Sequence, residues 1–315
     1  MRVLLSSALL GLAWFVAANA LASLAAWLVA RRTLRRQPPI GASRLLALRL
    51  LPAATSILFT LFIFLPAHLR FEPVDSDESF GIVLGSIAAL GLLLVSRATR
   101  RAVRAMTAGR AFEALVRRAG NVTAGGALEV GGLYGVSLSG IWRPRILIGS
   151  EARAALTPAE LDLAISHEVA HRRSLDNLKR FLMHTAPDLF GWTMAARQLE
   201  ERWQAEAECE ADAHAVMGDG QRAVLLASAL VKVARLACVG SLRSASPAWS
   251  AFHVPSLLEM RVRRLVSGAV PTPASRRTFA WSGATAALVV PVGLWLLEFS
   301  YTLHAVTEAM VARLP

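Results

Sequence analysis

The sequence predicts a mainly α-helical membrane protein, with four transmembrane helices and an α+β domain between the third and the fourth. Its 315 residues are 55% hydrophobic and its mean hydropathy is +0.47, which is too apolar for an ordinary soluble domain. Four apolar stretches approach or exceed the roughly 20 residues that a helix needs to cross a bilayer. A long, more polar region separates the last two stretches.

The predicted spans lie at about residues 4–30, 50–69, 79–95 and 279–301, of which the third is the shortest. The first stretch also fits a signal peptide, with small residues at Ala18-Asn19-Ala20 as its cleavage site. Its apolar run continues for about ten residues past that site and ends in arginines, which favours a membrane span.

Arginine clusters predict the orientation of the spans. They follow the first and third spans and precede the fourth, at Arg31, Arg32, Arg35, Arg36, Arg97, Arg100, Arg101, Arg104, Arg276 and Arg277. The loop between the second and third spans is acidic, with Asp75, Asp77 and Glu78. The positive-inside rule therefore predicts cytoplasmic residues 97–277 and extracytoplasmic termini. We expect a multi-pass protein of a bacterial inner or plasma membrane.

The net charge of +12 has the same origin, because arginines beside a span contact anionic lipid. They follow no nucleic-acid recognition motif, so we expect no direct nucleic-acid partner. The two cysteines exclude a disulfide framework. The predicted organisation is a three-span region at 1–104, a cytoplasmic domain at 105–275, and the fourth span with a short extracytoplasmic tail at 276–315.

The cytoplasmic domain should begin with a basic amphipathic helix at residues 105–118. Short apolar runs separated by glycines predict strands at 127–130, 133–138 and 145–148. Such a sheet offers an edge to which an extended peptide can add as another strand, although a purely structural hairpin fits the pattern equally well.

A helix start signal follows the strands. Thr157-Pro158-Ala159-Glu160 is a capping box with proline at the first helical position, and the helix should continue to Arg172 or Arg173. Further helices are expected at 174–190, broken at Pro187, and at 192–216, 221–237 and 255–266.

The predicted helix contains His167-Glu168-Val169-Ala170-His171, an H-E-x-x-H pentad. Histidines at i and i+4 lie on one face and can share one metal ion. Glu168 can then reach the attacking water as general base. The pentad is the minimal apparatus for zinc-dependent peptide hydrolysis.

A catalytic zinc ion needs a third protein ligand. A metzincin would place a glycine and a histidine where this chain has Ser174 and Asn177, which excludes that class. Glu208 and Asp212 lie at i and i+4 of a later helix, so Glu208 can bind the metal while Asp212 contacts a ligand histidine.

Two further residues stay open as parts of the site. His214 is a rival ligand or an oxyanion-stabilising residue, and Tyr134 is a second candidate for the oxyanion. The sequence does not choose between them. Cys209 lies next to Glu208 and should therefore face away from the metal.

These residues resemble the integral-membrane zinc peptidases of the beta-lactam sensor and antirepressor type, BlaR/MecR-like. The resemblance covers nearly the whole chain. It rests on residues 138–148, on H-E-x-x-H-x-x-x-x-D-x-L from His167 to Leu178 with Asp176 as its aspartate, on Pro187, Trp192, Glu208-x-x-x-Asp212 and Arg261–Leu265, and on the arrangement of spans.

The resemblance implies a gluzincin-type zinc protease domain on the cytoplasmic side. His167, His171 and Glu208 would bind Zn²⁺, Glu168 would be the general base, and Asp212 and Asp176 would support the ligands. Only about a dozen residues follow the fourth span, so we expect no C-terminal penicillin-binding sensor domain of the kind that the family carries.

Three functions remain open. The first is a signalling endopeptidase that cleaves a transcriptional repressor or another partner protein. The second is a housekeeping membrane protease similar to HtpX or the prenyl-protein peptidases. The third is a zinc-stabilised signalling scaffold, against which the intact Glu168 argues, because a structural site needs no base. A homo-oligomer is compatible with each.

Overall fold

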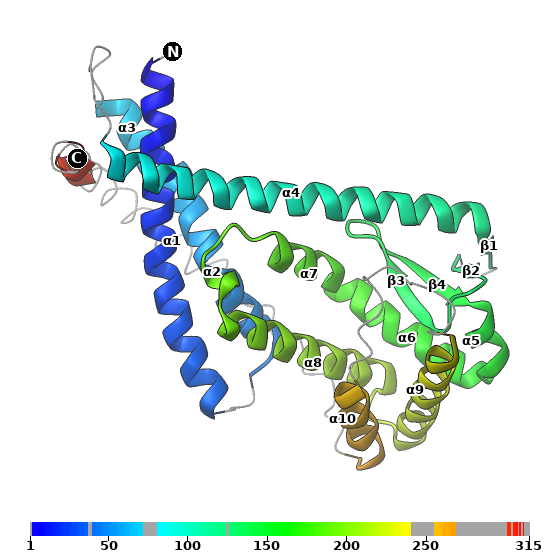
Figure 1. The fold of residues 1–315 in the computed structure, drawn as a ribbon. Helices are drawn as coiled ribbons and strands as arrows, with labels where there is room; N and C mark the ends of the chain where they lie inside the picture. Colours follow the sequence, from blue (N-terminus) through cyan, green and yellow to red (C-terminus); the bar gives the residue numbers. More distant parts are fainter. Residues whose placement is uncertain are drawn as a thin grey trace. The chain divides into compact units, whose positions relative to one another are not determined.

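A computed structural model describes residues 2–36, 40–71, 81–123, 126–240 and 255–268, with short pieces between 301 and 311 (Figure 1). The chain divides into two compact units. The first holds Met1–Arg100, Thr185–Glu200 and Arg276–Pro315, and the second holds Arg101–His184 and Glu201–Ser275. The division passes through two helices, α4 (Ile82–Ala119) and α8 (Met194–Val216).

The first unit contains helices of membrane-spanning length. They are α1 (Arg2–Arg36), α2 (Ala42–Phe59) with the π-helical turn η1 (Thr60–Phe64) and α3 (Leu65–Phe71), and the start of α4. Within the described residues, three helical segments are long and apolar enough to cross a membrane: Ser7–Arg35, Ala42–Arg70 and Ile82–Arg118. The chain therefore has the character of a multi-pass membrane protein.

The predicted fourth span, 279–301, lies outside the described residues except for its last residue. The acidic loop at residues 75–78, on which the predicted orientation partly rests, lies outside them as well.

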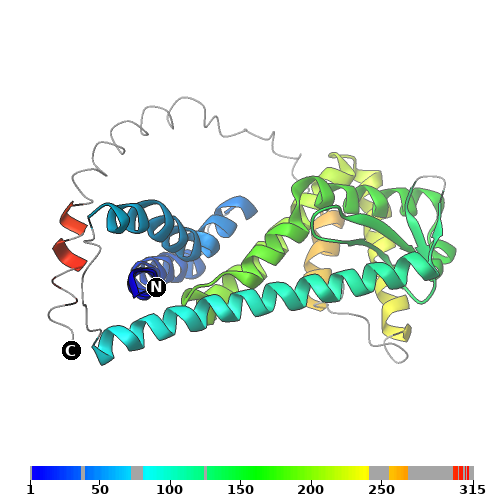
Figure 2. The ribbon, with the colours of Figure 1, turned by 90° about the horizontal axis from the view of Figure 1, so that it is seen from above.

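Helix α4 differs from the prediction, which separated a span at 79–95 from an amphipathic helix at 105–118. The structure has one uninterrupted helix, which Figure 2 shows along its length. The arginine-rich segment between the two predicted helices contains neither proline nor glycine, and arginine is a good helix former. The change from apolar to charged residues alters the surroundings of the helix but does not end it.

A buried polar network holds together segments of the first unit that are distant in sequence. The Asn19 Nδ2 of α1 donates to Ser56 Oγ of α2 at 2.9 Å and to the Pro187 carbonyl at 3.1 Å. The backbone N–H of Leu189 donates to Asn19 Oδ1 at 2.9 Å. Residues 187–192, which we call the strap, are thereby bound to the first two predicted spans. The strap ends in the 3₁₀ helix η2 (Phe190–Trp192).

A buried ion pair reinforces the strap. Arg49 of α2 is 3% exposed, and it contacts Asp188 at 3.1 Å and Glu200, in the first turns of α8, at 2.5 Å. This explains why α2 begins eight residues before the predicted span at 50–69: the charge of Arg49 is neutralised inside the unit rather than exposed at the end of a helix.

The second unit contains a four-stranded mixed sheet, with strands β1 (Asn121–Val122), β2 (Leu128–Val130), β3 (Val136–Ser139) and β4 (Arg145–Gly149) in the order β1-β2-β4-β3. Strands β2 and β4 are parallel, and the other pairs are antiparallel. The three predicted strands are confirmed with small shifts. The exposed two-residue β1 carries no apolar pattern and was not predictable from it.

The sheet is covered on both faces. On one face Leu128 and Leu147 pack against Val116 of α4. On the other, Ile146 and Ile148 pack against apolar side chains of α6 (Pro158–Ser174). Strand β3 is an outer strand of this sheet.

The helices of the second unit follow the predicted order. After α5 (Ser150–Ala155) come α6, α7 (Asp176–Thr185), α8, α9 (Gly220–Gly240) and α10 (Pro255–Val266). Helix α6 begins with the predicted capping box, in which Thr157 and Glu160 cap each other. One apolar cluster contains Leu163 of α6, Val216 of α8, Leu226 of α9 and Leu265 of α10, so the four helices share a core.

Candidate metal centre

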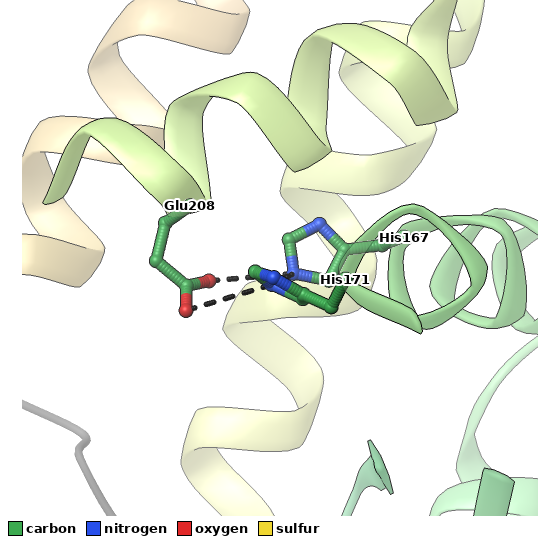
Figure 3. Close-up of side chains that lie close together, drawn as sticks. All are labelled: His167, His171 and Glu208. Atoms are coloured by element: carbon green, nitrogen blue, oxygen red, sulfur yellow. Dashed lines mark hydrogen bonds and ion pairs between the residues drawn. The ribbon is translucent and has the colours of Figure 1, made fainter. Parts of the chain in front are cut away.

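His167, His171 and Glu208 converge although they come from two helices (Figure 3). The histidines lie on α6, one turn apart, and Glu208 projects toward them from α8. Both imidazoles are buried, and the Glu208 side chain is 13% exposed. One ligand atom from each residue lies within 4.8 Å of the others, so these three side chains could hold a metal ion.

The distances between the nitrogen and oxygen atoms of the three side chains are close to those between ligands that share one metal ion, although the two histidines approach different oxygens of Glu208. The two Nε2 atoms are 3.1 Å apart, His167 Nε2 is 3.3 Å from Glu208 Oε2, and His171 Nε2 is 3.6 Å from Glu208 Oε1. Ligands at about 2.0–2.1 Å from a tetrahedral ion lie about 3.3 Å from one another. The three side chains are therefore close enough together to hold one metal ion.

Each imidazole has a carboxylate at its other nitrogen. Asp176 Oδ2 lies 2.8 Å from Nδ1 of His171, and Asp212 Oδ1 lies 3.0 Å from Nδ1 of His167. The second contact is close but not aligned as a hydrogen bond, so Nδ1 of His167 has no well-directed partner among the described residues. Carboxylates in these positions fix the tautomer and direction of a ligand histidine.

Arg261 is part of the cluster, a role that no step of the sequence reasoning gave it. Its guanidinium contacts Asp212 at 2.6 and 2.9 Å and Glu208 at 2.9 Å, and it approaches His167 Nε2 to 3.4 Å. Arg261 is a charged residue on the apolar face of α10, three and four residues from the cavity-lining Leu258 and the buried Leu265. A charged residue on an apolar helix face was the signal in the sequence by which Arg261 could have been identified as part of the site.

The charges of the cluster are mutually stabilised. Burial opposes ionisation of Asp212, but the Arg261 guanidinium beside it lowers its pKa to about 2. Burial also favours neutral His171, yet hydrogen bonds to Asp176 and Glu208 raise its pKa to about 10. Hydrogen bonds from both histidines hold the pKa of Glu208 well below its ordinary value, against the effect of burial. A metal needs neutral imidazoles, so it competes with these protons.

Glu168 lines the same cavity as the three converging residues. The cavity has a volume of about 170 Å³ and is bounded by α6, by β3 and by α7 to α10. Burial raises the pKa of the Glu168 carboxyl. A carboxyl group of this kind, beside a metal site, can accept and return a proton.

Tyr134 and His214 do not line this cavity. His214 is exposed on α8, and Tyr134, in the turn before β3, is partly buried elsewhere. The structure thus brings six of the candidate residues together and leaves these two apart. Cys209 faces away from the ligands, with its Sγ 3.9 Å from Met260 Sδ.

Comparisons with protein-family models, with curated proteins and with solved structures find no match to this chain. The resemblance to BlaR/MecR-like peptidases accordingly stays an interpretation of the motifs. What the chain shows is three candidate membrane helices and a buried His-His-Glu group that could hold a metal.

Proposed function

We propose that the protein is a membrane-embedded zinc endopeptidase that hydrolyses peptide bonds on the cytoplasmic side of the membrane. The observation that carries the proposal is the presence of Glu168 in the same cavity as His167, His171 and Glu208. A purely structural metal site needs no additional carboxyl group, whereas hydrolysis needs a base close to the attacked carbon.

Zinc is the metal that this donor set favours. Two imidazoles and one carboxylate leave one tetrahedral position open, which is the arrangement of catalytic rather than structural zinc sites. When bound, zinc would polarise the scissile carbonyl and make an attacking water more acidic.

The residues of the chain would divide the remaining work. Glu168 takes a proton from the attacking water and returns it to the nitrogen of the scissile bond, so that the C–N bond breaks with a neutral amine, rather than an amide anion, as the leaving group. Asp176 and Asp212 hold the two imidazoles in position. Arg261, which holds Asp212 in turn, keeps that carboxylate ionised.

Strand β3 supplies the surface for the peptide. Gly149 N donates to the Gly135 carbonyl, and the antiparallel register then directs the backbone groups of Ser137 toward β4. Those of Val136 and Leu138 face the open edge, where both residues border the metal cavity. Asn177 donates to the carbonyls of Leu138 and Gly140 at 3.2 and 2.8 Å, which marks one end of that edge.

The biological role that we propose is transmembrane signalling through cleavage of a repressor or another partner protein. The arginine clusters that follow the first and third predicted spans support a cytoplasmic site.

This orientation is tested with a cysteine introduced at Asp77 in a Cys238→Ala background, because Cys238 is exposed and Cys209 is buried. The new thiol should react with a membrane-impermeant reagent added outside the cell.

The catalytic proposal is tested with Glu168→Gln. This variant should retain the metal, because Glu168 is not a ligand, and should lose peptide hydrolysis. Proteomes of cells that express either form would reveal the fragments that depend on Glu168. Equal fragment patterns, in cells whose purified proteins both contain zinc, would overturn the proposal.

A further inference from the structure

A second cavity lies beside the metal cavity, on the other side of β3. It has a volume of about 370 Å³ and is formed by residues 105–117 of α4, by β3 and by the turn from β3 to β4. Both cavities are lined by Ser137, Leu138, Asn177 and Arg180. The second cavity thus shares part of its wall with the first, at the strand that we assign to peptide binding.

The second cavity is strongly basic. One carboxylate, Glu113, lines it together with five arginines: Arg110, Arg117, Arg143, Arg145 and Arg180. Arg117 pairs with Glu113 at 4.0 Å and Arg180 with Glu208 at 3.3 Å. In the part of the chain that the structure describes, the other three arginines form no ion pair. Their charge is available to a ligand.

The two cavities lie on opposite faces of the sheet, so a strand added to β3 would offer them alternate side chains. Val136 and Leu138 turn their side chains to the α6 face, where they pack beside Ile146 and Ile148. Ser137 is paired with Leu147, which packs toward α4 on the opposite face. Since successive side chains of a strand point to opposite faces, a peptide along β3 would direct every second side chain toward α4.

We infer that the arginine-lined cavity is a specificity subsite that accepts acidic side chains of the substrate, at alternate positions from those that enter the metal cavity. This inference rests on the proposed function for its biological meaning. The substrate class it names is a protein segment in which acidic residues alternate with apolar ones.

The surroundings favour a peptide over other anions. Residues of the outer strand β3 line the cavity, and so does Trp142, an apolar side chain that is 67% exposed. An extended peptide offers main-chain groups for the edge and carboxylates for the arginines. A lipid headgroup or free phosphate would use only the arginines.

The test measures peptide binding to the full-length Glu168→Gln protein in detergent micelles, so that hydrolysis does not interfere. Three fluorescent peptides share one apolar sequence and carry Asp, Asn or Lys at every second position. A fourth peptide has the composition of the Asp peptide with its acidic residues in one block. Fluorescence anisotropy gives each Kd, and each measurement is repeated with inorganic phosphate and with phosphatidylglycerol vesicles as competitors.

The alternating Asp peptide should bind about tenfold more tightly than the Asn peptide, because several arginine–carboxylate contacts, each weak at a partly exposed site, act together. The Lys peptide and the block peptide should both bind more weakly than the alternating Asp peptide. In Arg110→Gln/Arg143→Gln the preference should fall to about twofold or less. Arg118→Gln is the matched control: it removes an exposed arginine of α4 that does not line the cavity, and it should keep the preference.

Equal Kd values for the Asp and Asn peptides, or a preference that survives Arg110→Gln/Arg143→Gln, would overturn the inference. So would displacement of the Asp peptide by phosphate or lipid vesicles at concentrations where the Asn peptide stays bound, because the cavity would then be a site for phosphate or for a lipid headgroup. Failure of the proposed function is distinguishable: the wild-type protein would cleave nothing, while the peptide preference of the Glu168→Gln protein would stand.

Discussion

Asp176 Oδ2 lies 2.8 Å from Nδ1 of His171, so the first residue of α7 fixes the direction of a ring at the end of α6. Leu175, between the two helices, adopts the left-handed conformation with φ of 56°. This residue ends α6 and lets α7 begin at the next position, from which the Asp176 carboxylate reaches the ring of His171. The short connection is therefore part of the metal centre.

Replacement of Asp176 by alanine should weaken metal binding by about 10- to 100-fold, because the ring of His171 loses the group that orients it. Lys179→Gln is the control, since Lys179 contacts the other oxygen of Asp176 and should affect binding little. Competition with a coloured chelator measures both affinities. An unchanged affinity in Asp176→Ala would show that packing alone orients His171.

The ligand assignment predicts opposite results for two residues of α8. Zinc content, measured by mass spectrometry of the purified protein, should collapse in Glu208→Ala and remain near one equivalent in His214→Ala. His214 is exposed and outside the cavity, so its loss removes nothing from the site. The reverse pattern would make His214 the third ligand.

Glu160 predicts a pH dependence of stability. Burial would raise its pKa, but hydrogen bonds from Lys232, Ser228 and Thr157 outweigh burial and lower it from 4.5 to about 2. A carboxyl group with a lowered pKa in the folded state stabilises fully above about pH 4.5 and loses that contribution as the pH falls to about 2.

Glu160→Gln should therefore reduce the free energy of unfolding by about 1–3 kcal/mol at pH 7, and by progressively less as the pH falls from 4.5 to 2. Chemical denaturation in micelles measures the difference. Asp162→Asn, on the exposed side of the same helix, should change the free energy of unfolding little, both at pH 7 and at low pH. A constant difference across the pH range would mean that the charge of Glu160 is not what stabilises the helix start.

The ion pair of Arg49 and Asp188 gives a prediction for the membrane-spanning unit. Arg49→Ala should cost about 3–5 kcal/mol, because it leaves the buried carboxylate of Asp188 without its partner. The double variant Arg49→Met/Asp188→Leu should be the more stable of the two. Thermal unfolding of Arg49→Ala and of the double variant in micelles gives the comparison. A double variant that is less stable than Arg49→Ala would contradict the prediction.

The sequence anticipated the local features of the site better than the long-range ones. The capping box at Thr157, the turn spacing of His167 and His171 and the helical spacing of Glu208 and Asp212 are local patterns, and each is present in the structure. The apolar periods also located the longer helices and most strands.

Features that depend on pairing across the chain were not predictable from such patterns. Arg49 begins a buried ion pair with residues more than 130 positions away, so its charge misplaced the start of a predicted span. Asn177 is an ordinary polar residue in the sequence, and Arg261 is marked there only by its position on the apolar face of α10. The fold brings Arg261 to the ligands and Asn177 to the edge of β3. Hydropathy could not detect the continuity of α4, because it measures solvation rather than backbone geometry.

The strap, residues 187–192, which Asn19 and Arg49 hold, lies between two helices of the metal centre in the sequence. Helix α7 ends just before the strap and α8 begins just after it, and these helices carry Asp176 and Glu208. Asp176, which orients the ligand His171, and the ligand Glu208 are thus linked along the chain to one segment that α1 and α2 hold. One segment of six residues therefore occupies the covalent connection between the helix that carries Asp176 and the helix that carries Glu208, and its own backbone is fixed by side chains of α1 and α2.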